Sequence, residues 1–191
     1  MKPRPVSILV VLATVLSLSG SAVAQEPKPA EVFNAFAVSL QQGGGTAIEI
    51  VINRWSTEGE KKLLMNVLKA SGSEEMVRIM QDLPQVGYIK GANTMGDALF
   101  YAWSTSNPDG TRSVVIATDR PISAAAMVAP GTANKYDATV IEMHFKKGGG
   151  KGEGKIVVAG KAYIDPKTGK PGITNYEGQP VILESITSKT P

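Results

Sequence analysis

The sequence predicts an α+β fold, in which a curved antiparallel sheet or open barrel of about eight strands carries a helical hairpin inserted after the second strand. Two observations favour this fold. Short runs with apolar residues at every second position recur between well-marked turns, at a spacing typical of antiparallel neighbours. One stretch, residues 57–83, instead carries its apolar residues at helical spacing. Since no internal repeat is visible, we expect a single α+β domain over residues 32–191.

The N-terminal segment, residues 1–24, is typical of a secretory signal peptide. A short basic start precedes an apolar run over residues 6–18, and the segment ends in the small-x-small pattern of residues 22–24. The apolar run is too short to cross a bilayer comfortably, since a spanning helix takes about 20 residues. We therefore expect cleavage before Gln25, a short leader over residues 25–31, and a soluble exported protein that is periplasmic or secreted.

Composition restricts the chemistry of this chain. It has no cysteine, which excludes disulfides, thiolate metal sites and thiol nucleophiles, and His144 is its only histidine. A chain that starts at Gln25 loses Lys2 and Arg4, so most of the formal net charge of +3 disappears and gives no reason to expect a nucleic-acid partner. We predict no metal, no cofactor and, after signal removal, no transmembrane segment.

Two strand-like runs, residues 32–40 and 46–55, open the domain, and the glycines at 43–45 between them are typical of a hairpin loop. In the second run Ile48 and Ile50 lie at alternate positions. That spacing predicts one dry face and one wetter face for the strand.

The helical hairpin follows this pair of strands. Thr57 and Glu60 are spaced as a capping box, which predicts a helix start, and a second helix is expected over residues 74–83. Leu64 and Leu68 lie four residues apart and therefore share one helix face. We expect that face to dock on the sheet, because an isolated helix of this length is marginal in water.

The rest of the chain consists of strands and turns. The expected strands are residues 86–90, 97–104, 112–118, 138–147, 155–165, 172–177 and 180–187. The long connection over residues 119–137 is interpreted as a loop that wraps a sheet edge, although long connections are also often functional.

A glycine-rich segment raises the hypothesis that this chain binds a nucleotide. Gly149 to Lys155 fits the spacing G-x-x-x-x-G-K of a phosphate loop. However, Ile156 stands where a Mg²⁺-binding Ser or Thr is required, and the residues after it are strand-like where a phosphate loop needs a helix. We predict a hairpin loop here.

Several residues are candidates for a ligand site. They are Trp55, Tyr101, Trp103, Asp119, Arg120, Glu142 and His144. Tyr101 and Trp103 share a predicted strand face with Leu99, and such a cluster either lines a ligand pocket or forms core under the helical hairpin. Glu142 and His144 share the polar face of one strand, where a His–carboxylate pair can do acid–base work but is more commonly a solvated surface contact.

Two classes of function stay open. The first is a non-enzymatic binding or envelope-associated module, and the alternative is a carboxylate-based hydrolase or lyase that uses acids near Asp119 and Glu142. Convergence of Asp119, Glu142 and His144 in one cleft favours the enzyme, whereas scatter over the surface favours the binding module. No residue is assigned a catalytic role.

Lysines crowd the C-terminal third of the chain. They include Lys146, Lys147, Lys151, Lys155, Lys161, Lys167 and Lys170. This pattern predicts weak contact with anionic envelope surfaces, or alternatively protection of exposed strands against aggregation. No aromatic residues are interleaved with the lysines to stack on bases, so nucleic acid is again not expected.

A set of short segments resembles a family of exported bacterial proteins of unknown function. The segments are Ile48-Glu49-Ile50, Arg54-Trp55-Ser56-Thr57, Val86-Gly87-Tyr88-Ile89, Ala117-Thr118-Asp119-Arg120-Pro121-Ile122, Gly152-Glu153-Gly154-Lys155 and Asn175-Tyr176-Glu177-Gly178-Gln179-Pro180. The resemblance covers most of the chain after the signal and implies a bacterial, exported, single-domain protein. It implies no activity, ligand or catalytic residue.

Overall fold

The structure is a computed structural model that describes residues 28–40, 43–92, 94–120, 122, 138–158, 160–167, 171–175 and 179–190. The predicted signal peptide and the first part of the predicted leader lie outside the described residues. Most of the long connection over residues 119–137 also lies outside them.

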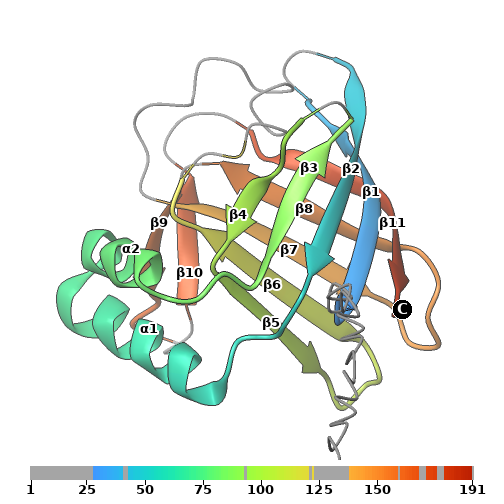
Figure 1. Cartoon of the computed structure of the whole chain (residues 1–191). Helices are drawn as coiled ribbons and strands as arrows, with labels where there is room; N and C mark the ends of the chain where they lie inside the picture. The colour runs from blue at the N-terminus through green and yellow to red at the C-terminus, as the bar shows by residue number, and fades with distance from the viewer. Residues whose placement is uncertain are drawn as a thin grey trace, which may run out of the picture.

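Nine strands form one antiparallel sheet that curls into a nearly closed barrel (Figure 1). They are β1 (Glu31–Val38), β2 (Gly45–Ile52), β3 (Gly87–Gly91), β4 (Asp97–Leu99), β5 (Tyr101–Ser106), β6 (Arg112–Thr118), β7 (Thr139–Phe145), β8 (Gly152–Val158) and β11 (Val181–Lys189). Their order across the sheet is β4-β3-β2-β1-β11-β8-β7-β6-β5. A separate two-stranded sheet pairs β9 (Gly160–Ile164) with β10 (Pro171–Asn175). The predicted curved antiparallel sheet with helices after the second strand is confirmed.

The barrel closes where the chain bends at Phe100, between the edge strands β4 and β5. The Phe100 N–H donates to the Ala117 carbonyl of β6 at 3.1 Å. Leu99 points into the barrel and is fully buried, whereas Tyr101 and Trp103 lie on the outer face. The prediction that Leu99 shares a face with these two aromatics is therefore wrong, because the bend adds one residue to the strand alternation.

Apolar side chains fill the barrel interior. Ile48, Ile50 and Ile52 all belong to this core, which confirms the predicted dry face of the second strand. Phe33 and Ile141 are among the largest fully buried side chains. In the described part of the chain the barrel interior is thus a packed core.

Arg112 closes the core at the end where β1 and β6 begin. Its Nη1 and Nη2 donate to the two carboxylate oxygens of Glu31, each at 2.7 Å, and its Nε donates to Ser104 Oγ at 2.7 Å. The guanidinium carbon also lies 5.6 to 5.9 Å from three ring centroids, those of Phe33, Trp55 and Phe145. Trp55, a predicted ligand residue, therefore packs at this barrel end.

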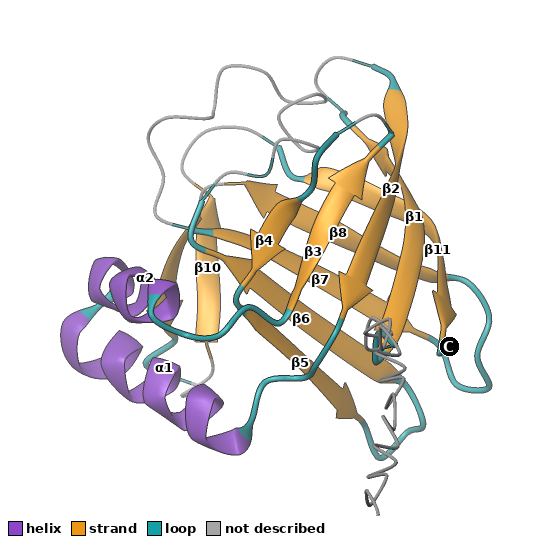
Figure 2. Ribbon diagram, viewed as in Figure 1, coloured by secondary structure: helices purple, strands orange, loops and turns teal. Residues whose placement is uncertain are grey.

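Two helices, α1 (Glu58–Ser71) and α2 (Ser73–Gln81), form the hairpin that covers one side of the barrel (Figure 2). The capping box is present, since Thr57 Oγ1 accepts from the Glu60 N–H and the Glu60 carboxylate accepts from the Thr57 N–H. Hydrogen bonds from Arg54 hold the pKa of Glu60 at about 2, and they tie the end of β2 to the start of α1. Among the described residues no helix is long and apolar enough to cross a bilayer.

A second apolar core lies between this hairpin and the outer face of the barrel. Leu64 and Leu68 are 5% and 6% exposed and pack with Met76, Met80 and Val140. The predicted docking of the apolar helix face is confirmed. This second core positions the cavity described next.

Candidate ligand-binding cavity

A cavity of about 340 Å³ lies outside the barrel, between the helical hairpin, the outer face of β5–β7 and the β9–β10 hairpin. Small-molecule sites commonly measure about 300–1,000 Å³, so this volume suits a small ligand. Tyr101 and Trp103 lie on the barrel wall of the cavity, and Leu64 and Leu68 of α1 lie on the helical wall. Ala162 of β9 borders it from the third side.

The barrel wall changes from apolar to polar along its strands. Strand pairing places outward-facing residues in three parallel rows. The apolar row is Tyr101, Ala117 and Val140; the mixed row is Trp103, Val115 and Glu142; the polar row is Thr105, Ser113 and His144. Successive rows are two residues apart along each strand, a separation of about 7 Å. The helices bury the apolar row, where Ala117 and Val140 are 6% and 8% exposed, so the cavity is driest there.

Two charged side chains, those of Lys61 and Glu142, lie at the mixed row of the barrel wall. The Lys61 Nζ of α1 lies 3.9 Å from the centroid of the Trp103 ring, a cation–π contact, and 3.8 Å from Glu58 Oε1. Glu142 Oε2 lies 3.1 Å from the Nζ of Lys155 on β8. The carboxylate at the cavity is therefore already paired, whereas the lysine at the cavity rests on an aromatic ring.

Tyr101 adds a buried hydroxyl to the apolar row. Burial, with a smaller contribution from the charge of Glu58, raises the pKa of Tyr101 to about 12. The phenol is therefore neutral near pH 7 and can donate a hydrogen bond. Within the described ranges no residue hydrogen-bonds the Tyr101 hydroxyl.

Of the predicted ligand residues, Tyr101, Trp103 and Glu142 come together at this cavity. His144 lies in the neighbouring polar row, exposed, with Nδ1 at 3.2 Å from Ser113 Oγ. Glu142 and His144 lie on the same outer face in adjacent rows, and the ion pair that Glu142 makes is the cross-strand one with Lys155.

Asp119 and Arg120 lie away from the cavity. The Asp119 carboxylate accepts from Arg120 Nε and Nη2, both at 2.8 Å; burial alone would raise its pKa, but these bonds lower it. Asp119 comes four residues after Val115, which pairs with Glu142, so the two acids stand about 13 Å apart along the sheet. That exceeds the roughly 5–9.5 Å of a glycosidase pair, so the structure does not bring the predicted acids together.

The predicted single strand over residues 155–165 is wrong, because the structure divides it between β8 and β9, and β9 pairs with β10 where a strand over residues 172–177 was predicted. The chain instead leaves the barrel near Gly160 and packs on the helices, where the Ala162 N–H donates to Ser73 Oγ at 3.1 Å. A Cβ at Gly160 would lie 2.2 Å from Cγ2 of Ile173, so this close approach requires glycine. A glycine inside a predicted strand was the available signal.

Lys61 lines the cavity but is not among the predicted ligand residues, because the helical spacing alone singles out only the apolar face of Leu64 and Leu68. Among the described residues there is no group of three or more His, Asp or Glu arranged to hold a metal ion.

No protein-family model, curated protein or solved structure matches this chain. The resemblance to exported bacterial proteins therefore stays a prediction, and the function must be argued from the cavity.

Proposed function

We propose that this protein is a non-enzymatic binding module that holds a small, largely apolar ligand in the cavity under its helical hairpin. The observation that carries the proposal is a cavity of about 340 Å³ with apolar walls and two aromatic side chains, Tyr101 and Trp103. A solvent-connected cavity of this size with largely apolar walls is typical of small-molecule sites, so it favours an apolar occupant.

The cavity also has a route to solvent at its polar end. The side chains of Lys61 and Glu142, which border it, are 36% and 32% exposed. A ligand entering there can bury its apolar surface against the apolar row, at about 25 cal/mol per Å² removed from water. A carboxylate-based hydrolase or lyase has less support, because Asp119 and Glu142 stand on different parts of the sheet.

Filling the cavity is expected to weaken ligand binding. The probe is N-phenyl-1-naphthylamine, a neutral apolar dye whose fluorescence rises on leaving water. We expect Ala162→Phe to weaken dye binding by about tenfold or more, because the added ring occupies the cavity. The matched control is Ala47→Phe, which adds the same ring to an exposed position on β2 and should leave binding unchanged.

A second measurement locates the dye. The chain has two tryptophans, and Trp55→Phe leaves Trp103 as the only one. Energy transfer from Trp103 to bound dye is expected in that variant. Dye binding that is equal in the parent, Ala162→Phe and Ala47→Phe would refute the proposed site.

We further propose that the protein acts outside the cytoplasm, in the periplasm or after secretion. The support is the signal-like N-terminal segment, residues 1–24. Intact mass of protein recovered from the exported fraction is expected to correspond to a chain that begins at Gln25. Cytoplasmic protein that retains the apolar run would contradict this.

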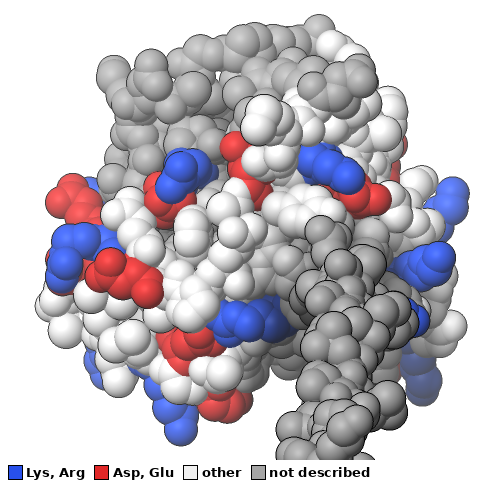
Figure 3. Space-filling model, viewed as in Figure 1, with Lys and Arg blue, Asp and Glu red and all other residues white. Residues whose placement is uncertain are grey.

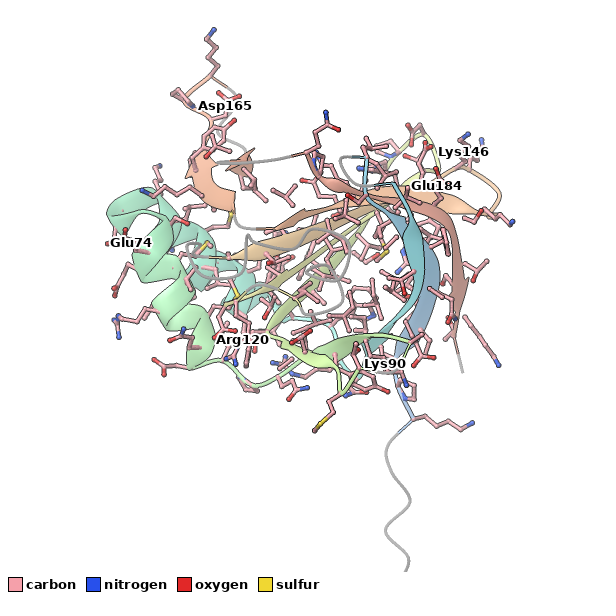
Figure 4. The ribbon with its side chains drawn as sticks, turned by 90° about the horizontal axis from the view of Figure 1, so that it is seen from above. Glu74, Lys90, Arg120, Lys146, Asp165 and Glu184 are labelled. Atoms are coloured by element: carbon pink, nitrogen blue, oxygen red, sulfur yellow. The ribbon has the colours of Figure 1, made fainter. Side chains whose placement is uncertain are left out.

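Contact with anionic envelope surfaces is proposed through the β7–β8 turn, where Lys146, Lys147 and Lys151 are all exposed. Figure 4 places Lys146 at the opposite end of the molecule from Glu74 of α2, so such contact would leave the helical side free. On the face that carries the helices, acidic and basic side chains are interspersed, which does not favour a strong single-sign patch there (Figure 3).

A further inference from the structure

Some polar groups at the cavity already have a hydrogen-bond or ion-pair partner, and others do not. This difference indicates which chemical class of ligand the cavity binds. Among the described lining residues Glu142 supplies the carboxylate, and it already pairs with Lys155. The Lys61 ammonium has Glu58 at 3.8 Å, beyond hydrogen-bond distance, and the Tyr101 hydroxyl has no hydrogen-bond partner among the described residues. The groups left for a ligand therefore include two donors, the charged Lys61 ammonium and the neutral Tyr101 hydroxyl, whereas the hydroxyls of Tyr101 and Thr105 can also accept.

We infer that the ligand is a small anionic amphiphile, with its apolar body along the apolar row and an anionic head, such as a carboxylate, against Lys61. This inference rests on the proposed function, because it names the ligand class of the same cavity. The order of the three rows along the barrel wall sets the orientation of the ligand in the cavity. Leu64 and Leu68 belong to the apolar cluster that contains Ala117 and Val140 and packs against Tyr101, whereas Lys61 lies over Trp103 of the next row.

A cationic head is disfavoured at the same place. The face of the Trp103 ring, which would otherwise attract a cation, already carries the Lys61 ammonium. The Glu142 carboxylate is likewise neutralised by Lys155. A cationic head would therefore meet the ammonium groups of Lys61 and Lys155, while the nearby Glu58 carboxylate already faces Lys61 at 3.8 Å. Like charges at a binding site select against a partner.

The test compares three amphiphiles of similar chain length that differ mainly in the head: decanoate, decanol and decyltrimethylammonium. Each is titrated at pH 7 against the full chain with N-phenyl-1-naphthylamine bound, and dye displacement is measured. We expect decanoate to displace the dye at about tenfold lower concentration than decanol. The decyltrimethylammonium ion is expected to be the weakest competitor.

Lys61→Met removes the charge but keeps a long apolar side chain, so it should abolish the preference for decanoate while dye binding persists. Lys62→Met is the matched control, because Lys62 is the next residue of α1, exposed and outside the cavity lining, and this variant should keep the preference. Circular dichroism of both variants checks the fold.

The outcomes separate the two proposals. Equal displacement by decanoate and decanol, with dye binding intact, would overturn the anionic-head inference and leave the binding module standing. A decanoate preference that survives in Lys61→Met would also overturn it. No dye binding to the full chain would overturn both proposals, and a segment of the chain itself would then be the occupant to seek.

Discussion

Replacing Arg112 with alanine is expected to lower the free energy of unfolding by about 3 kcal/mol, toward the lower end of the range for breaking a buried ion pair. The change leaves the Glu31 carboxylate, whose side chain is 7% exposed, without its two hydrogen bonds from the guanidinium. It also removes the group that packs against the rings of Phe33, Trp55 and Phe145. Urea denaturation of parent and variant measures the loss.

A surface pair that also shares two hydrogen bonds provides the control. Arg78 also donates two hydrogen bonds to one carboxylate, that of Glu75, but its side chain is 61% exposed. Arg78→Ala is therefore expected to change stability little, since exposed ion pairs are screened by water. Equal small losses in both variants would mean that Arg112 does not secure the barrel end.

The loss in Arg112→Ala should also depend on pH. Burial alone would raise the pKa of Glu31, but hydrogen bonds from Arg112 and Ser188 and the charge of Arg112 together lower it. A carboxyl with a lowered folded-state pKa contributes stability above its ordinary pKa of about 4.3, and that contribution is lost as the pH falls through the folded-state value. The stability gap between parent and variant should therefore narrow below about pH 4.

Truncation of Leu64 or Leu68 to alanine is expected to cost about 2–5 kcal/mol, since each is a buried leucine in the second core. We expect losses of stability toward the lower end of this range, because both side chains also border the cavity. On that side they have no neighbouring atoms to lose contact with. Such losses are a large share of a typical domain stability of about 5–15 kcal/mol. Shifts of the urea midpoint measure them.

Lys62→Ala serves as the control on the same helix, because Lys62 is exposed and lines no core. It should leave the urea midpoint nearly unchanged. If all three variants matched the parent, the hairpin would not be held by its apolar face, and the cavity beneath it would lose its helical wall.

Part of the candidate site could be predicted from the sequence, and part could not. Tyr101 and Trp103 were identified because alternation along one strand places them on a common face. Asp119 was grouped with Glu142 only by residue type, and strand register then placed the two apart. Lys61 was not identified, because a helical position does not reveal which strand residue it will face.

Local patterns in the sequence determined the fold class, most of the strands and the capped start of α1, because strand alternation and helix capping depend on residues a few positions apart. The bend at Phe100 and the departure of β9 from the barrel were decided only by tertiary structure. Those two features set which face carries Tyr101 and Trp103 and where the β9–β10 hairpin packs. The cavity exists only where α1, β5–β7 and that hairpin meet, so it depends on contacts between distant segments that no local pattern specifies.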